Sequence, residues 1–273
     1  MSASELKAFL MRAIPGPYRN AFSYVRNCIR DRDYIREYIR DRDYIRDYIK
    51  DRDYNTEGYS QCGEDLLLRW LFDNVANGFY VDVGAHHPKR FSNTYYFYKH
   101  GWTGINIDPT PGVIDIFKKA RPRDINLPYA VASSARDLTL YVFNEHAVNT
   151  LSPDFARLQW EQFGRRFTSE IVVRTHTLAE ILHAHKPDHR PIQFLSVDVE
   201  GLDLEVLESN DWDRYIPNVI LCEDLSLRNV ECLSSSGVWA FLHARGYTLV
   251  GKCAHTLVFA HYTYKTVELS PVK

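Results

Sequence analysis

The stretch Phe79-Tyr-Val-Asp-Val-Gly-Ala85 decides the fold of this chain. Four of its first five residues are apolar or aromatic, which favours a strand buried on both faces. Gly84 follows where such a strand turns, and a glycine there lets the backbone approach a ligand closely. A second apolar run, Gly104-Ile-Asn-Ile107, ends in Asp108 roughly 25 residues after Asp82. The pattern predicts two parallel strands joined by a helix, with an acid at the tip of the second strand.

Helical and strand signals alternate from Tyr59 onward. Helices are expected at 65–76, 93–100, 112–120, 153–163, 177–184, 203–209 and 236–245, and strands at 79–83, 104–107, 126–132, 137–143, 170–174, 192–197 and 217–222. A closing hairpin is expected from 247–252 and 256–261. This alternation predicts an α/β fold, a mostly parallel sheet with helices on both faces and an antiparallel C-terminal hairpin at one edge.

Residues 1–54 contain a ten-residue repeat, as in Ile39-Arg-Asp-Arg-Asp-Tyr44-Ile-Arg-Asp-Tyr48. Its paired apolar residues and opposite charges three positions apart favour a helix. Ten residues at about 100° each fall about 80° short of three turns, so the apolar stripe winds around the helix. We therefore expect an N-terminal helical oligomerisation stalk over 1–54 and a catalytic domain over 59–273. The alternative is a solvated helix without a specific partner.

Composition excludes several classes of protein. The net charge is -2, with Lys+Arg 33 against Asp+Glu 35, which lacks the basic excess of nucleic-acid-binding proteins. The 5 Cys are scattered without a CxxC, so we expect neither a disulfide framework nor a zinc site, and a cytoplasmic location. No apolar run approaches the ~20 residues that span a bilayer. Peripheral association with the inner face of a membrane, through the stalk, is compatible with this.

Residues after the first two predicted strands point to a cofactor, because ligands of parallel sheets bind beyond the carboxyl ends of the strands. Asp82 could meet the amino group of a methionine, and the helix near Asn93 offers free N–H groups to a carboxylate. Asp108 could accept hydrogen bonds from both hydroxyls of a ribose. These features predict S-adenosylmethionine (SAM); a nicotinamide enzyme would favour GxGxxG, and an ordinary strand-helix-strand unit binds nothing. The candidate cofactor residues here are Asp82, Gly84, Ala85, Asn93, Asp108 and Pro109, and Asp198 after a later strand is a further one.

The chain resembles the FkbM family of methyltransferases over roughly residues 59–262. The resemblance is carried by Tyr59-Ser-Gln-Cys-Gly-Glu-Asp65, Phe79-Tyr-Val-Asp-Val-Gly-Ala85, Phe91-Ser-Asn-Thr94, Gly101-Trp-Thr-Gly-Ile-Asn-Ile-Asp-Pro109, Phe194-Leu-Ser-Val-Asp-Val-Glu-Gly-Leu-Asp203, Ser209-Asn-Asp-Trp212 and Pro217-Asn-Val-Ile-Leu-Cys-Glu223. It implies a Rossmann-like class I methyltransferase with a mostly parallel seven-stranded sheet. It also implies SAM as cofactor and methyl transfer to oxygen on sugars, glycans, polyketides or related natural products.

The resemblance further implies that Ser60 and Gln61 lie over the methionine end of the cofactor. Their segment could instead simply begin a helix, and Glu64 could cap it. The family often has Asn at the position of His86, so the role of that position is open.

Acidic residues follow the fourth and fifth main strands: Asp198 and Glu200 after one, Glu223 and Asp224 after the other. Adjacent carboxylates repel unless a cation or a proton neutralises them. Oxygen ligands of this kind suit Mg²⁺ or Mn²⁺, and the layout is similar to that of metal-dependent sugar O-methyltransferases. We therefore expect Asp198, Glu223 and Asp224 to bind a metal that chelates a vicinal diol. The alternative is that these acids cap helices or hydrogen-bond the substrate without a metal.

The expected reaction is O-methylation of a sugar hydroxyl in a bacterial surface glycan or a glycosylated natural product. Removing the hydroxyl proton requires a base, and the candidates are Asp198, Glu200, His176 and His255. A polyketide, lipid or protein acceptor is the alternative within enzymes. A non-catalytic SAM-binding scaffold is the alternative outside them.

The stalk hypothesis predicts that deleting residues 1–54 lowers the oligomeric state, because the repeat supplies the contact between copies. Light scattering of the full chain and of the truncated chain measures this directly. An unchanged mass per particle, after subtracting the deleted residues, would reject the stalk.

Overall fold

The computed structural model describes residues 56–227 and 229–264 of the 273-residue chain. The predicted stalk over 1–54, and the homo-oligomer expected from it, lie outside these residues and stay predictions. Among the helices in the described ranges, none combines the length and the apolar character needed to cross a membrane.

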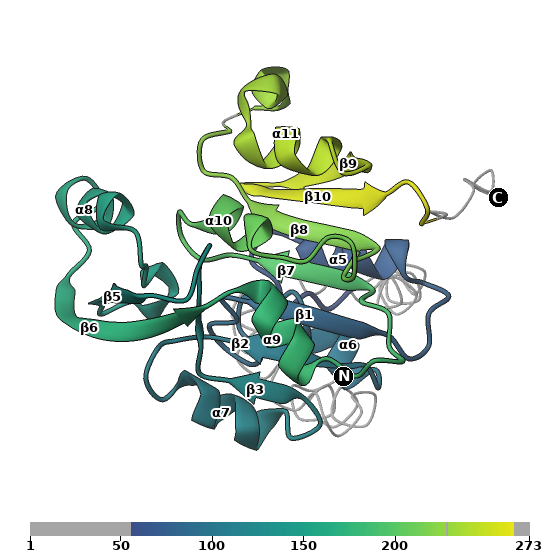
Figure 1. Ribbon diagram of the computed structural model, residues 1–273, viewed down its shortest axis with the longest axis horizontal. Helices are drawn as coiled ribbons and strands as arrows, with labels where there is room; N and C mark the ends of the chain where they lie inside the picture. Colours follow the sequence, from purple (N-terminus) through teal and green to yellow (C-terminus); the bar gives the residue numbers. More distant parts are fainter. Residues whose placement is uncertain (1–55, 228, 265–273) are drawn as a thin grey trace, which may run out of the picture. The chain divides into compact units, whose positions relative to one another are not determined.

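The main sheet has seven strands in the order β3-β2-β1-β7-β8-β10-β9 (Figure 1). Neighbours from β3 to β8 pair in parallel, and β10 pairs antiparallel with both β8 and β9. This confirms the predicted fold class, including the antiparallel C-terminal hairpin. The strands are β1 (Phe79–Val83), β2 (Thr103–Ile107), β3 (Ile125–Leu127), β7 (Phe194–Val197), β8 (Val219–Glu223), β9 (Tyr247–Cys253) and β10 (Thr256–His261).

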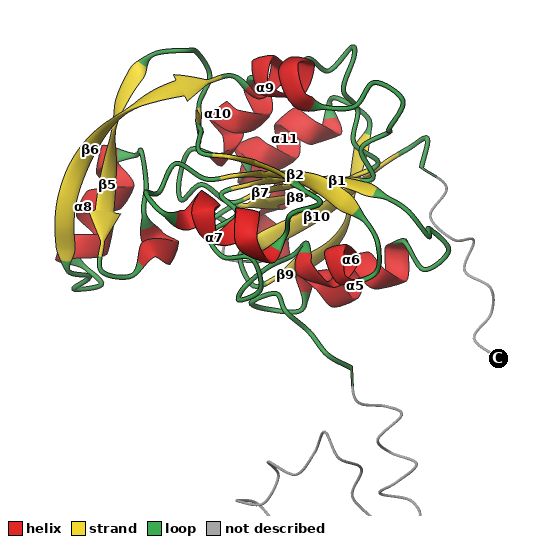
Figure 2. Ribbon diagram, turned by 90° about the horizontal axis from the view of Figure 1, so that it is seen from below, coloured by secondary structure: helices red, strands yellow, loops and turns green. Residues whose placement is uncertain are grey.

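Helices cover both faces of this sheet, as Figure 2 shows. On one face α9 (Leu178–His185), α10 (Asp203–Glu208) and α11 (Gly237–His243) contribute buried side chains to one core cluster. On the other face α5 (Glu64–Leu71) and α6 (Tyr95–Lys99) contribute to a second. A smaller cluster joins α7 (Val113–Ala120) to Ala85.

Alternation along β1 explains the two cores. Phe79, Val81 and Val83 point into the first cluster, while Tyr80 points into the second. Successive side chains of a strand face opposite sides, so a strand buried on both faces is apolar at nearly every position. Asp82 is the exception within β1, and it is buried as well.

A row of buried polar residues crosses three neighbouring strands. Asp82 of β1 pairs in register with Asn106 of β2 on one side and with Ser196 of β7 on the other. All three side chains are buried. Since buried polar groups need hydrogen-bond partners, the segment that covers this row must supply polar side chains; Asn93 and Thr94 do so.

The region after β3 differs from the prediction. The strand expected at 126–132 is split into β3 and the short β4 (Ala130–Val131), with Pro128 between them. Proline has no N–H for the ladder, so one strand does not run through it. β4 leaves the main sheet and pairs with β6 (Phe167–His176).

A second sheet of three strands, in the order β4-β6-β5, forms an arm beside the main sheet (Figure 1). β5 (Asp137–Phe143) pairs antiparallel with β6 along most of its length. The segment between them forms η3 (His146–Val148) and α8 (Pro153–Glu161). A further short helix, η4 (Val230–Ser235), precedes α11.

Replacing Gly104 of β2 by alanine should destabilise the domain by about 1–3 kcal/mol, the usual cost of overpacking a core. The added Cβ would lie 2.1 Å from a ring carbon of Tyr80. That ring cannot swing away freely, because its hydroxyl donates a 2.7 Å hydrogen bond to Asp124. Urea unfolding of Gly104→Ala against wild type measures the difference. The matched control is Gly237→Ala at the start of α11, where a flexible leucine is the nearest neighbour at 3.2 Å. Equal free energies of unfolding for both variants would contradict the expectation.

Candidate functional site

Four parallel strands bring their carboxyl ends to one edge of the sheet. Val83 at the end of β1 is in register with Ile107 of β2 and with Val197 of β7, which in turn pairs with Cys222 of β8. The loops that follow these strands begin at Gly84, Asp108, Asp198 and Asp224. The acids that follow these strands therefore begin their loops at the same edge of the sheet.

Gly84 packs directly on the next strand tip. Its φ is +83°, and a Cβ there would lie 1.7 Å from the carbonyl oxygen of Asp198. Its N–H donates to the Ile107 carbonyl at 2.9 Å. Only glycine allows this approach, because any side chain would separate the tips of β1 and β7.

A cavity of about 520 Å³ opens between the tips of β1 and β2. Gly84, Asp108, Pro109 and Asp198 are among the residues that line it. The Asp108 carboxylate accepts the N–H of His86 at 2.9 Å on one oxygen and that of Thr110 at 2.8 Å on the other. Burial raises the pKa of Asp108, and these two N–H groups oppose the rise. The carboxylate is thus held in place with lone pairs left for a ligand.

The other predicted cofactor residues divide into two groups. Gln61 and Asn93 line a second cavity, of about 690 Å³, which also contains Gly84 and Asp198. Asn93 additionally donates to Ser196 at 3.1 Å. Ala85 does not line either cavity and instead packs on α7.

Ser60 begins a helix, which was the alternative to its predicted place over the cofactor. Its Oγ accepts the N–H groups of Gly63 and Asp65 at 3.2 Å and donates to the Asp65 carboxylate at 2.6 Å. It lines neither cavity. The hydroxyl is occupied in starting α5 because the first N–H groups of a helix have no partner within the helix.

Asp82 also differs from its predicted role. Its carboxylate lies inside the protein, lines neither cavity, and accepts the Thr94 hydroxyl at 2.9 Å. Burial raises the pKa of Asp82 to about 6, against the opposing effects of Arg121 and Thr94. The residue therefore holds the loop after β1, and the structure brings its side chain to neither of the two cavities.

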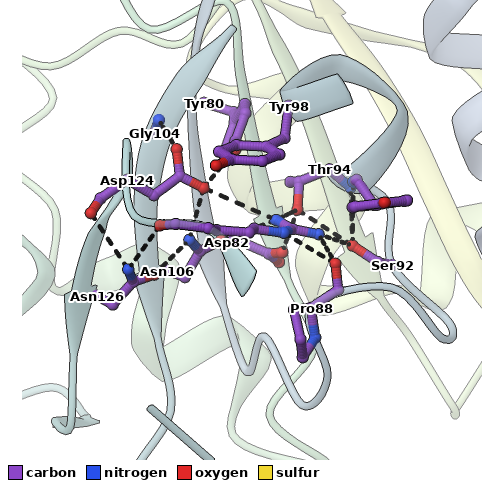
Figure 3. A network of polar contacts seen from close by, with 12 residues as sticks. Tyr80, Asp82, Pro88, Ser92, Thr94, Tyr98, Gly104, Asn106, Asp124 and Asn126 are labelled. Carbon is purple, nitrogen blue, oxygen red and sulfur yellow. Dashed lines mark hydrogen bonds and ion pairs between the residues drawn. The ribbon is translucent and has the colours of Figure 1, made fainter. Parts of the chain in front are cut away.

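Arg121 organises that loop, and Figure 3 labels its partners Pro88, Ser92, Thr94 and Asp124. Its guanidinium is fully buried and donates to the Pro88 carbonyl at 2.8 Å and to Ser92 and Thr94 at 2.7 Å each. It also lies 3.9 Å from the Asp124 carboxylate. A buried charge is tolerated only with such a complete set of partners. The network ties residues 88–94 to Asn106 of β2 and Asn126 of β3.

Three carboxylates gather where the second cavity meets the strand tips. Oxygens of Asp198, Glu200 and Glu223 all lie within 4.8 Å of one another. Asp198 is exposed to the cavity, and one oxygen of Glu223 is buried without a hydrogen-bond partner. The structure thus brings together two of the three predicted metal ligands, with Glu200 as the third.

Asp224 does not join this group, which corrects the prediction for that residue. Its carboxylate accepts from the backbone and hydroxyl of Ser226 at 3.0 and 2.5 Å and from the Ser236 hydroxyl at 2.5 Å. Ser236 caps α11, so Asp224 connects the tip of β8 to that helix. The pattern Asp-Leu-Ser is typical of a turn held by the acid's own side chain, a signal that the sequence did contain.

The loop after β7 places Glu200 in the cavity. Asp203 accepts the N–H groups of Val199 at 3.0 Å and Gly201 at 3.1 Å. The Thr150 hydroxyl donates to the Glu200 carbonyl at 2.8 Å. Glu200 and Gly201 both take left-handed backbone conformations, at φ 57° and 103°. The spacing of Asp-Val-Glu-Gly-Leu-Asp thus has a local cause, because the last acid folds the loop that presents Glu200.

The electrostatics of the group favour neutralisation. The pKa values of Asp198, Glu200 and Glu223 are all raised, first by removal from bulk water and then by the neighbouring carboxylates. Asp198 is open to the cavity, yet protein atoms and other acids crowd it on the remaining sides. Such a group holds either protons or a bound cation at neutral pH.

Backbone strain concentrates at the second cavity. Within the described residues, four residues other than glycine have a left-handed φ: His86, Phe91, Glu200 and Ala254. All four line this cavity. Such conformations cost about 1–3 kcal/mol each and cluster at functional sites, so the cavity is the candidate acceptor site.

The two predicted histidine bases lie in different places. His255 lines the second cavity, beside the acids. His176 lines neither cavity, and its ring packs on Tyr129 at 4.6 Å. The structure therefore does not bring His176 to the acids.

His86 has a position that residue patterns alone do not indicate. It lines both cavities, and both ring nitrogens are buried without a hydrogen-bond partner. Burial, followed by the charge of Arg90, lowers the pKa of His86 to about 4, so the ring is neutral at physiological pH.

The fold and this edge of the sheet are those of a SAM-dependent methyltransferase. The chain belongs to the FkbM methyltransferases, since residues 82–249 match the family described as the methyltransferase FkbM domain. No curated protein matches it. Among solved structures, the TehB-like SAM-dependent methyltransferase from Corynebacterium glutamicum is similar over 80% of this chain and 96% of that chain. Their sequence identity is 12%, and the TM-score is 0.36.

Asp108→Asn should weaken binding of S-adenosylhomocysteine, the demethylated cofactor, by about ten-fold or more, because an amide nitrogen cannot accept the N–H groups or the ribose hydroxyls. Isothermal titration measures the affinity. Asp115→Asn, an exposed residue of α7, is the control and should bind normally. Equal affinities for the two variants would show that Asp108 does not hold the cofactor.

Proposed function

We propose that this methyltransferase transfers the methyl group of SAM to a hydroxyl oxygen of a sugar or glycan. The acceptor would present two neighbouring hydroxyls to a divalent cation held by Asp198, Glu200 and Glu223. The observation that supports this most directly is the group of three carboxylates within 4.8 Å. All three line the candidate acceptor cavity, and Asp198 and Glu200 also line the candidate cofactor cavity.

The donor set fits a hard cation such as Mg²⁺ or Mn²⁺. All three ligands offer carboxylate oxygens, which these ions prefer. The unpartnered oxygen of Glu223 needs a proton or a cation, because a buried polar atom left alone costs about 1–3 kcal/mol. A divalent ion would hold two hydroxyl oxygens of a diol and lower the pKa of the one to be methylated.

The residues of the chain divide the remaining work. Asp108 accepts the ribose hydroxyls, and Gly84 lets the backbone approach the cofactor. Asp198 lines both cavities, so it lies where cofactor and acceptor meet. The proton leaving the acceptor hydroxyl passes to a carboxylate of the group or to His255, which lines the same cavity.

Activity is tested by incubating the purified chain with SAM and a panel of nucleotide sugars, glycans and glycosylated natural products. Mass spectrometry then detects the gain of a methyl group. Methylation of a lipid, polyketide or protein instead would reject the sugar acceptor. Binding of SAM with no methylation of any acceptor class would support a scaffold role.

Metal dependence predicts that Mn²⁺ binds the purified chain and that Glu223→Gln loses this binding. Electron paramagnetic resonance of Mn²⁺ measures it without any acceptor. Treatment with EDTA should lower the methylation rate at least about ten-fold, as expected for losing a Lewis acid, and added Mg²⁺ should restore it. Glu208→Gln, an exposed residue of α10, is the control. Full activity after EDTA treatment would reject the metal and leave the acids as hydrogen-bonding groups.

A further inference from the structure

Phe91 and His86 both line the acceptor cavity, and the chemistry described above gives neither residue a role. Both rings line the cavity that contains the three carboxylates. The rings lie nearly parallel, with an interplanar angle of 17° and centroids 6.4 Å apart. We refer to this pair as the aromatic wall.

Folding alone does not account for Phe91. Its side chain is 48% exposed, so much of a large apolar ring faces the cavity instead of a core. Its φ of 56° is unusual for a bulky residue and strains the backbone. The neighbouring Ser92 and Thr94 are held by Arg121, and the Ser92 N–H donates to the Tyr59 carbonyl at 3.0 Å. The backbone is thus constrained to present this ring to the cavity.

His86 adds the polar half of the wall. A neutral imidazole has one N–H donor and one acceptor nitrogen, and here neither has a protein partner. Leaving such groups buried and unpaired is destabilising. Because the ring lines both cavities, the missing partners must come from what those cavities bind. The backbone N–H of His86 donates to the Asp108 carboxylate, and this hydrogen bond fixes the position of the residue.

We propose that the aromatic wall recognises a pyranose ring, whose apolar C–H face stacks on Phe91 while one of its hydroxyls exchanges a hydrogen bond with His86. This inference rests on the proposed function, because it assumes that the acceptor cavity takes a sugar.

A pyranose supplies what the wall and the acids need together. One face of the ring carries polarised C–H bonds, which an aromatic face attracts. Its hydroxyls both donate and accept, so they match a neutral imidazole and also the carboxylates nearby. An acyl chain would make apolar contact with the Phe91 ring but would leave both ring nitrogens of His86 without a hydrogen bond.

The conservative replacement for His86 follows from its backbone. Asparagine tolerates a left-handed φ, and its amide offers both a donor and an acceptor. His86→Asn therefore keeps the conformation and part of the hydrogen bonding, whereas His86→Ala removes the hydrogen bonding and keeps the strain.

Saturation-transfer NMR tests the wall with the full chain, S-adenosylhomocysteine and Mg²⁺. The probes are the methyl pyranosides of glucose, mannose, galactose and rhamnose. At least one probe should receive saturation mainly at the C–H groups of one ring face. Phe91→Ala should weaken its binding about five-fold, as expected for one aromatic contact, whereas Phe91→Trp and His86→Asn should retain most of it. His86→Ala should weaken it as well. The control His100→Ala changes an exposed histidine of the surface and should bind as wild type does.

The outcomes separate this inference from the proposed function. Unchanged pyranoside binding in Phe91→Ala would overturn the wall and leave a sugar acceptor standing. Absence of saturation transfer to every pyranoside would overturn the pyranose specificity, whichever acceptor the methylation assay finds. Calorimetry should show unchanged S-adenosylhomocysteine affinity in Phe91→Ala; a parallel loss of cofactor binding would mean that the substitution disturbs the loop and would also reject the wall.

Discussion

A buried guanidinium is the constraint on which the candidate site depends. Arg121 has no exposed surface, and its charge is compensated by Asp124 and by hydrogen bonds to the loop after β1. That loop crosses the polar row of Asn106, Asp82 and Ser196 on the central strands. Desolvating these groups is favourable only when all of them are paired, so the loop has essentially one position over the sheet (Figure 3).

This rigid support explains how the site can contain strain. The loop after β1 carries two left-handed residues, His86 and Phe91, and the loop after β7 carries a third, Glu200. Each residue would change to an unstrained backbone conformation if the surrounding structure did not constrain it. The Arg121 guanidinium holds the first loop through hydrogen bonds to Pro88, Ser92 and Thr94. The buried carboxylate of Asp203 holds the second loop by accepting two backbone N–H groups. The hydrogen bonds of Arg121 and Asp203 therefore offset the backbone strain of the residues that line the cavity.

Much of this arrangement was predictable, because it follows from periodicity and from the geometry of parallel sheets. Alternating apolar strands and helices led to the seven-stranded sheet, and the rule that parallel strands end at one edge brought Asp108, Asp198 and Glu223 together. Ser60, Asp82 and Asp224 were expected to face the cofactor or a metal, and the structure instead pairs their side chains within the protein. In each case a partner within the protein takes the side chain, and for Asp82 and Asp224 part of that partnership comes from Thr94 and Ser236, which lie on other elements.

The sequence by itself determined the class of fold, the FkbM family and the strand tips at which chemistry is expected. These depend on local patterns, which act over a few residues. Only the tertiary structure decided which acids face the cavity and which are used inside the protein. It also showed that Asp82, within the opening stretch Phe79-Tyr-Val-Asp-Val-Gly-Ala85, supports the loop, while Gly84 shapes the cavity. The direction of a side chain on a loop depends on contacts distant in the sequence, and no local pattern contains them.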